Sequence, residues 1–453
     1  MKRYLESALL ACKGGLMIAS ACTLVLLPMK GVAAVSLESA SDKTITLPWV
    51  LEKTLLSNPQ LQSFPYELRV SEALTLQAGI TPNPKLSVEL ENLLGTGDKQ
   101  GVENAEISLG LSQLIELGDK RQRRIDFAHA SKRQSLAEYE LLRLEVLSQA
   151  TQSYYQLLRL QALLEWNQHG IQIEEKALKA IELRAKAGAV AKADVTKMAL
   201  RLMRARSAQQ QLEGDVQVAK QRLAANWAGE AHFDRAEGEL GRFTELPSAA
   251  DVLNAIETAP QYLQLLSVER LMYAKRRVEE SKAQYDITLG MGVRSYDGFD
   301  DAALMFNFSM PIPLSNPNQG NILAAKANES LAMEQQKLVR GQLKLTLLEI
   351  HQSMVNSALV AELLQKELQP LAQRLLKETE LAYQTGQANV LQLADAQSEL
   401  LNIKRELIEA KTAVYLQKLE LERITGQSMS AAHQRQLSHS FLNTEPMMAQ
   451  ENH

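Results

Sequence analysis

Two stretches of this 453-residue chain decide its fold: RAKAGAVAKADVTKMALRLMRAR at residues 184–206 and AYQTGQANVLQLADAQSELLNIKRE at residues 382–406. Each is an Ala- and Leu-rich helical sequence that a single glycine interrupts, and Gly188 and Gly386 lie 386 − 188 = 198 positions apart. Glycine readily takes the positive φ that ends a helix. Each stretch is therefore predicted to turn one helix back on another, and its occurrence at two matching places favours a turn over a glycine tolerated inside a helix.

The match between the two halves extends well beyond the glycines. LPWVLEKTLLSNPQL at 47–61 has a partner in LPSAADVLNAIETAPQY at 246–262, and ENAEISLGLSQLIELGDKRQRRIDFA at 103–128 has one in DDAALMFNFSMPIPLSNPNQGNILAAKA at 300–327. Each half has one order of predicted elements: a short helix, two alternating segments, a very long helix, a glycine turn and a second helix. The predicted domains are a first repeat over 35–245, a second repeat over 246–426, and a disordered polar tail over 427–453.

Four segments alternate between apolar residues and polar or small ones, the pattern of a strand with two different faces. They lie at about 84–93, 105–115, 286–296 and 302–312. The apolar face packs on a helix if the sheet is small and soluble, and faces lipid if it is part of a membrane barrel. Open sheet edges are excluded in lipid, so a barrel requires several chains, and three would supply 3 × 4 = 12 strands.

The predicted helices are unusually long. Residues 119–187 contain no proline and only one glycine, Gly170, and residues 321–385 are broken only by Gly341 and Pro370. About 69 residues rising about 1.5 Å each would reach about 100 Å. Helices of this length indicate coiled-coil packing. A rod of this length favours the membrane interpretation of the strands, because it suits a structure that crosses a periplasm.

The N-terminus has the order of parts of a secretory signal peptide. Basic Lys2 and Arg3 precede the apolar run GGLMIASACTLVLLP at 14–28, which leads to the small-residue site VAAVS. Cleavage is predicted after Ala34, so residues 1–34 would be removed. The alternatives are an uncleaved membrane anchor, for which the run is short, and acylation at Cys22.

The predicted mature chain offers little chemistry beyond its fold. Both cysteines precede Ala34, which excludes disulfides and thiolate sites after cleavage. Removing four basic residues and one acidic residue leaves 45 Lys and Arg against 52 Asp and Glu, a charge of −7, so there is no electrostatic case for binding nucleic acid. The seven histidines show no metal-ligand spacing, and no nucleotide-binding or nucleophile motif is present. We predict no enzyme, no cofactor and no metal site.

Three segments carry a family resemblance: PNPKLSVELEN at 82–92, SQLIELGDKRQRR at 112–124 and MPIPLSNPNQGNILAAKA at 310–327. The chain resembles, over about 47–426, the TolC-type outer-membrane channels of tripartite efflux and type I secretion systems. The segments look most like the branch that serves cobalt–zinc–cadmium and copper–silver efflux pumps.

The resemblance implies a mixed α and β fold. A 12-stranded outer-membrane β-barrel, with four strands from each subunit of a homotrimer, continues as an α-helical coiled-coil barrel through the periplasm. The expected partners are outer-membrane lipid, a periplasmic adaptor and an inner-membrane RND-type pump, and the expected cargo is metal cations. Two alternatives stay open: the same channel serving drug efflux or polypeptide secretion, and a periplasmic coiled-coil scaffold or adaptor.

The resemblance also implies a gate at the periplasmic entrance. Tyr383 matches the family's gate tyrosine, and Asp194 matches the acid that partners the gate. Asp395 matches the inner of two aspartates that form rings at the entrance, whereas Gln392 stands at the outer position and Ala388 replaces the gate arginine. We therefore expect fewer ionic contacts to hold the closed state.

Two further expectations concern the turns. Gly188 and Gly386, with nearby Arg184 and Lys192, are predicted to dock the adaptor. Three Asp395 carboxylates around a narrow axis would attract cations and raise one another's pKa. The alternative is that Asp395 is an ordinary solvated carboxylate on a helix.

Overall fold

The computed structural model describes residues 44–97, 101, 105–238, 240, 246–296, 301–312, 314–316 and 318–427. All described elements belong to one unit, Lys43–His453. The predicted signal peptide with Cys12 and Cys22, and the predicted tail beyond residue 427, lie outside the described residues. In the part that is described, no helix is both long and apolar enough to span a membrane.

Four antiparallel strands form one sheet in the spatial order β2-β3-β5-β6. They are β2 (Lys85–Glu91), β3 (Glu106–Ile115), β5 (Ile287–Tyr296) and β6 (Asp301–Ser309). Strand β2 ends before Asn92, which takes a left-handed backbone conformation with φ 59°. Strand β6 ends at Ser309 rather than near residue 312, because Pro311 lacks the N–H that a continuing pair of strands needs.

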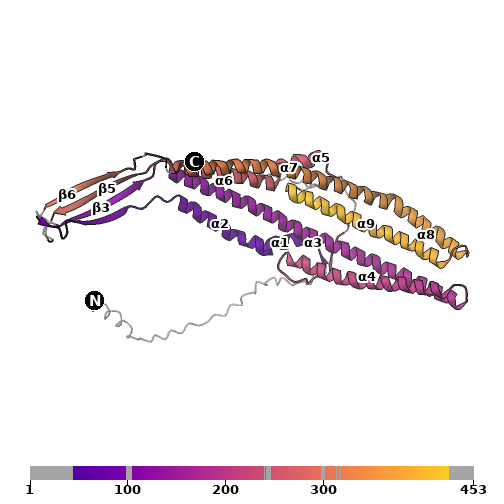
Figure 1. Cartoon of the computed structure of the whole chain (residues 1–453). Helices are drawn as coiled ribbons and strands as arrows, with labels where there is room; N and C mark the ends of the chain where they lie inside the picture. The colour runs from indigo at the N-terminus through magenta and orange to yellow at the C-terminus, as the bar shows by residue number, and fades with distance from the viewer. Residues whose placement is uncertain are drawn as a thin grey trace, which may run out of the picture. The chain divides into compact units, whose positions relative to one another are not determined.

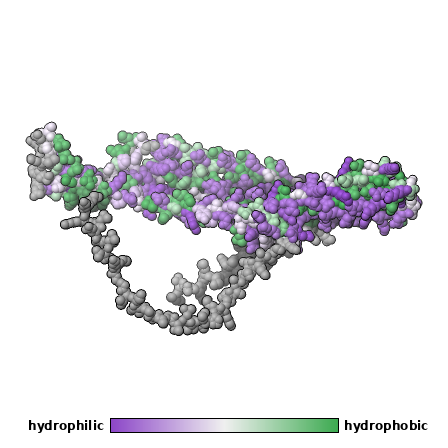
Figure 2. Space-filling model, turned by 90° about the horizontal axis from the view of Figure 1, so that it is seen from below, coloured by the Kyte–Doolittle hydropathy of each residue, from purple (hydrophilic) through white to green (hydrophobic). Residues whose placement is uncertain are grey.

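The register places like residues side by side across the sheet. Val88 lies opposite Leu109, and the row continues through Val293 and Leu304 on the next two strands. These four side chains are 46% to 76% exposed, and Figure 2 shows hydrophobic residues gathered over the sheet. Within the described chain no helix covers this apolar face, so the sheet lacks the packing that a small soluble sheet requires.

Nine α-helices are described, with one 3₁₀ turn and one π-helical turn. They are α1 (Leu47–Ser57), α2 (Pro59–Ala78), α3 (Lys120–Lys186), α4 (Lys192–Ala225), α5 (Ala249–Asn254), η2 (Ala255–Thr258), α6 (Pro260–Lys282), α7 (Gln319–Leu363), η3 (Leu364–Leu368), α8 (Gln369–Gln384) and α9 (Val390–Thr425). Helices α7 and α8 follow each other without a break, joined by η3. A short parallel pair joins β1 (Thr44–Ile45) to β4 (Arg235–Ala236).

The helices repeat the order of the strands. Beside the sheet the contacts run α2-α3-α6-α7, and each of these helices adjoins the strand at the same position in the sheet (Figure 1). Toward the two turns the contacts run α4-α3-α9-α8. Helix α3 belongs to both sets, and its 67 residues span about 100 Å at about 1.5 Å per residue.

The two halves differ at one place in their long helices. Helix α3 is continuous, whereas its counterpart consists of α7, the π-helical turn η3 and α8. Pro370 is the second residue of α8, after Gln369, and has no backbone N–H to donate to the preceding turn of helix. A wider π turn accommodates such a local disruption without ending the helix.

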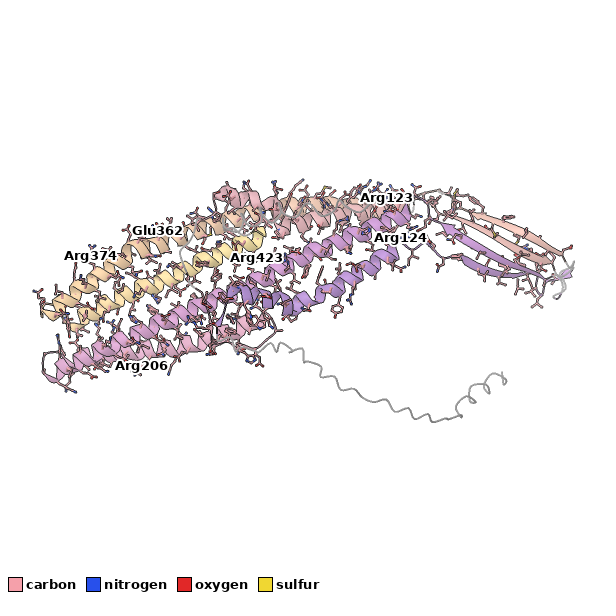
Figure 3. The ribbon with its side chains drawn as sticks, turned by 180° about the vertical axis from the view of Figure 1, so that it is seen from behind. Arg123, Arg124, Arg206, Glu362, Arg374 and Arg423 are labelled. Atoms are coloured by element: carbon pink, nitrogen blue, oxygen red, sulfur yellow. The ribbon has the colours of Figure 1, made fainter. Side chains whose placement is uncertain are left out.

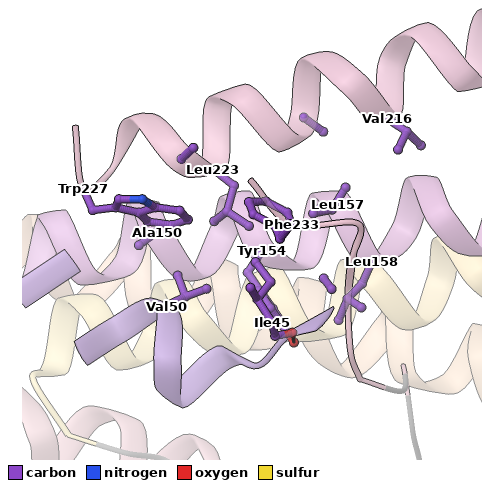
Figure 4. Packing of buried hydrophobic residues seen from close by; sticks show 13 residues of the cluster. Ile45, Val50, Ala150, Tyr154, Leu157, Leu158, Val216, Leu223, Trp227 and Phe233 are labelled. Atoms are coloured by element: carbon purple, nitrogen blue, oxygen red, sulfur yellow. Dashed lines mark hydrogen bonds between the residues drawn. The ribbon is translucent and has the colours of Figure 1, made fainter. Parts of the chain in front are cut away.

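Each half also has its own apolar core where a short helix packs on the long ones. In the first half, residues of α1, α3, α4 and the β1–β4 pair surround the fully buried Leu157 and Leu223 (Figure 4). Trp49 packs edge-on against Trp227 with ring centroids 5.6 Å apart. In the second half, α5, η2, α7 and α9 form the equivalent cluster, around Leu347. The internal duplication predicted from the sequence is therefore present in the packing.

Glycine ends the long helices at both turns. Gly188 has φ 75° and Gly386 has φ 79°, and a Cβ added at either would meet no atom within 4 Å. The N–H of Ala189 donates to the carbonyl of Arg184 at 2.9 Å, and that of Gln387 donates to the carbonyl of Ala382 at 2.8 Å. Glycine is needed here for its backbone conformation alone.

Replacing Gly188 or Gly386 with alanine should lower the free energy of unfolding by about 1 kcal/mol, because a left-handed backbone strains a residue that has a Cβ. Gly214→Ala is the matched control, since Gly214 lies inside α4 with ordinary helical geometry and open space around it. That change should instead stabilise α4 by up to about 1 kcal/mol. Thermal unfolding followed by circular dichroism measures both effects, and equal midpoints for all three variants would contradict the assignment.

Candidate functional site

The two helical turns lie together and share a small core. Ile181 of α3, Met198 of α4 and Val390 and Ala394 of α9 are each at most 2% exposed. The ring of Tyr383, in the last turn of α8, packs against this cluster. We call the cluster and the two turns around it the tip. Its core joins the first hairpin, α3 and α4, to the second, α8 and α9.

An aromatic–cation contact crosses between the hairpins at the tip. The guanidinium carbon of Arg184, in the last turn of α3, lies 4.2 Å from the centroid of the Tyr383 ring. Such contacts contribute about 0.5–1 kcal/mol when exposed and more when desolvated. The structure thus brings together a residue predicted for the gate and one predicted for adaptor docking.

Arg201 is the centre of a second link between the hairpins. From α4 it reaches Asp395 on α9 with an Nη1–Oδ1 distance of 2.9 Å, and Glu174 on α3 with a distance of 3.0 Å from Nε to Oε1. It also donates to the carbonyl of Ala394 at 3.2 Å and to the hydroxyl of Ser398. One guanidinium therefore holds three helices.

The two carboxylates bound to Arg201 lie in different environments. The side chain of Asp395 is 65% exposed, whereas that of Glu174 is 13% exposed, and Glu174 Oε2 is buried without a hydrogen-bond partner in the described structure. Burial raises the pKa of Glu174, Arg201 lowers it, and the nearby charge of Asp395 raises it. The net effect is a raised pKa for Glu174, and Arg201 offsets part of the effect of burial.

The other predicted gate residues make local contacts. Gln392 forms a capping box at the start of α9: its Oε1 accepts from the N–H of Asn389 at 2.8 Å, and its own N–H donates to Asn389 Oδ1 at 2.9 Å. Asp194 lies in the first turn of α4, where a negative charge suits the helix dipole. Among the described residues its carboxylate forms no ion pair and no hydrogen bond, and so none with Tyr383. Lys192 is exposed at the first residue of α4.

Sequence reasoning missed Arg201 and Glu174. Arg201 pairs with a residue 194 positions away, and no local pattern signals such a contact. The Asn389–Gln392 capping box could have been read from its spacing. In the described residues, no group of three or more His, Cys, Asp or Glu side chains is placed to hold a metal ion.

Comparisons with known proteins agree with this architecture. Residues 50–229 match the family model described as "Outer membrane efflux protein". The chain is 24% identical over 387 residues to the cobalt-zinc-cadmium resistance protein CzcC of Cupriavidus metallidurans, and the match covers 84% of this chain and 90% of that protein.

Solved structures show the same fold. The outer-membrane protein VceC of Vibrio cholerae matches with a TM-score of 0.66 and 17% identity, over 85% of this chain and 97% of that one. The outer-membrane channel OprN matches with a TM-score of 0.68 and 16% identity, over 84% and 90% of the two chains. The fold, the family-model match and the likeness to CzcC all agree with the predicted resemblance to the TolC-type outer-membrane efflux channels. This agreement supports the prediction that the strands lie in the outer membrane and the long helices in the periplasm.

Arg201→Gln should destabilise the protein by about 1–3 kcal/mol, because Glu174 keeps its burial and loses its charged partner. Without Arg201, which lowers the pKa of Glu174, that pKa rises further. A carboxyl group whose pKa is higher in the folded than in the unfolded protein lowers stability at any pH where the unfolded protein carries the charge. This cost disappears at low pH, where the group is protonated in both states. The loss relative to wild type should therefore be largest at neutral pH and shrink as the pH falls through the pKa of Glu174.

Arg206→Gln is the matched control. Arg206 pairs with Glu175 at 2.8 Å, one turn of α4 beyond Arg201, and both side chains are well exposed (Figure 3). Exposed pairs contribute about 0–1 kcal/mol, so this variant should unfold close to wild type at every pH. Chemical denaturation across a pH series measures both variants, and equal losses for the two would contradict the special role of Arg201.

Proposed function

We propose that three copies of this chain close a 12-stranded barrel and act as the passive outer-membrane channel of a tripartite efflux system. The sheet itself gives the first reason. Its outer strands, β2 and β6, each have one edge without a strand partner in the described chain, and backbone groups at such an edge cannot stay unpaired in lipid. Pairing β6 of each copy with β2 of the next would remove every edge.

Exposed apolar side chains on the outer helices support the same closure. Helix α2 precedes β2 at one side of the chain, and α7 follows β6 at the other. On α7, Leu331, Leu338 and Leu345 recur every seven residues and are 55% to 63% exposed. On α2, Val70 and Leu74 are 58% and 60% exposed. Heptad spacing is the pattern of a coiled-coil seam, and closure would bring these two rows together.

The other face of the sheet suits a water-filled lumen. Gly110, Gly292 and Met305 form one row across the sheet with Ser87, so the row is mostly small or polar. Barrels that conduct solutes keep apolar residues outside and polar ones inside. The channel would be passive, with the energy for transport supplied by the inner-membrane pump.

The proposed cargo is metal cations, and one observation carries this proposal. The chain matches 90% of the length of a protein described as conferring cobalt-zinc-cadmium resistance. The periplasmic adaptor would dock at the tip, where Arg184 and Lys192 flank the turn at Gly188, and Gly386 forms the second turn.

The gate is proposed to be held by the two links between the hairpins. The contact between Arg184 and Tyr383 and the bonds from Arg201 to Asp395 both join the first hairpin to the second. Opening the entrance would require the hairpins to separate, and adaptor binding would provide that force. Asp194 and Gln392 would line the same entrance.

Deleting the gene should sensitise the cell to one or more of zinc, cobalt, cadmium, copper and silver, and restoring it should reverse the effect, because the exit route for the cation would be lost. Growth across a concentration series of each metal and of several drugs measures this. Unchanged metal tolerance with lost drug resistance or lost polypeptide secretion would overturn the metal assignment and leave the channel in place.

Asp395→Asn should reduce the preference of the channel for cations over anions, because three carboxylates near the axis would be removed. Reversal potentials under a salt gradient in planar bilayers measure the preference. Glu213→Gln, an exposed carboxylate on α4 whose side chain accepts a hydrogen bond only from Gln209 in the described structure, is the matched control. An unchanged preference in Asp395→Asn would count against an entrance ring and favour a solvated helix carboxylate.

A further inference from the structure

An apolar cavity of about 720 Å³ opens where the helices meet the sheet. It lies between the end of α2, the segment leading into β2, and the first turns of α3, with one contribution from α6. Its apolar lining includes Leu74, Ile80, Pro82, Phe127 and Val278. Leu74 and Ile80 are 60% and 50% exposed. A cavity of this size and character is comparable to ligand pockets and has room for apolar side chains.

The wall of this cavity is held in place by Arg124. Its Nε donates to the carbonyl of Ala78 at 3.3 Å, and its Nη2 donates to the carbonyl of Ile80 at 3.2 Å. The same guanidinium pairs with Glu116, the residue after β3, with an Nη2–Oε2 distance of 3.0 Å. Figure 3 shows Arg124 where the helices approach the sheet. The Arg124 side chain therefore fixes the backbone at one wall of the cavity.

Two apolar residues that are still more exposed lie on a segment at the opposite edge of the sheet. After β6, Ile312 is 78% exposed and Leu314 is 92% exposed. The N–H of Leu314 donates to the carbonyl of Ile312 at 3.0 Å, and the hydroxyl of Tyr285 donates to the carbonyl of Ser315 at 2.7 Å. These hydrogen bonds hold the backbone at Ile312, Leu314 and Ser315, and leaving the two apolar side chains exposed to water is unfavourable.

The strand order would place these two features next to each other when two copies pair. The cavity belongs to the β2 edge, where Pro82 stands three residues before the strand begins, and the segment belongs to the β6 edge, just after that strand ends. Both lie at the end of the sheet that joins the helices. When β6 of one copy pairs with β2 of the next, antiparallel as in the rest of the sheet, the segment leaves β6 beside the cavity.

We propose that Ile312 and Leu314 of one copy insert into the cavity lined by Leu74, Ile80 and Phe127 of the next copy. This contact rests on the proposed trimer and deepens it, because it names the apolar side chains that anchor neighbouring copies where the barrel meets the helices. It also commits the cavity to a protein occupant. A lipid chain in the cavity is the competing outcome.

Cysteine cross-linking tests the contact directly, because Cys12 and Cys22 both lie in the predicted signal peptide and the chain after Ala34 has no cysteine. Leu74→Cys combined with Leu314→Cys should give covalent dimers and trimers with a short bismaleimide in native membranes. A flexible linker is used because disulfide geometry is strict. Each single variant, and Leu74→Cys combined with Leu183→Cys at the tip end of α3, should give none.

The outcomes separate the two proposals. Heat-resistant trimers on gels without the Leu74–Leu314 cross-link would overturn the contact and leave the trimer, and a lipid retained by such trimers in native mass spectrometry would identify the occupant. A complete absence of trimers would overturn both. As a second measurement, Leu314→Asn should lower the temperature at which trimers dissociate, whereas Leu183→Asn, also well exposed, should not.

Discussion

Unpaired backbone at the two edges of the four-stranded sheet is the constraint on which the rest of the structure depends. The N–H and C=O groups of β2 and β6 that face outward find no strand partner in the described chain, and lipid offers none. The apolar outer face, with side chains such as Val88 and Leu304, makes water an equally poor surrounding. Closure of the proposed barrel would pair these edges and turn the apolar face toward lipid, which a single copy of the chain cannot do.

The arrangement of the helices depends on the same pairing at the sheet edges. Because the contacts of α2, α3, α6 and α7 follow the order of the strands, whatever pairs at the sheet edges also aligns the helices beyond them. Helix α3 carries that alignment to the tip without interruption. The tip has a core of its own, around Ile181 and Met198, so the two hairpins hold together there independently of the sheet.

Local patterns predicted the fold, whereas contacts between the halves escaped prediction. Period-two alternation marks the strands and glycine with positive φ marks the turns, since both depend on a few neighbouring residues. The links from Arg201 to Asp395 and from Arg184 to Tyr383 join positions nearly 200 residues apart. Only the packing of the two helical hairpins against each other brings those residues together. Family resemblance pointed to Tyr383 as a gate residue, which stays a prediction, while Arg201 and Glu174 had no comparable signal.

The π-helical turn at Leu364–Leu368 compensates for a difference of one residue in length between the repeats. The buried residues Val146, Ala150 and Leu157 have counterparts at Leu343, Leu347 and Met354, each 197 positions later, yet the turn glycines are 386 − 188 = 198 positions apart. The second half therefore has one more residue than the first between the buried positions and the turn glycine. In an uninterrupted α-helix that residue would rotate everything beyond it by about 100° and carry Tyr383 away from Arg184. The wider turn absorbs the addition and keeps the second tip in phase with the first.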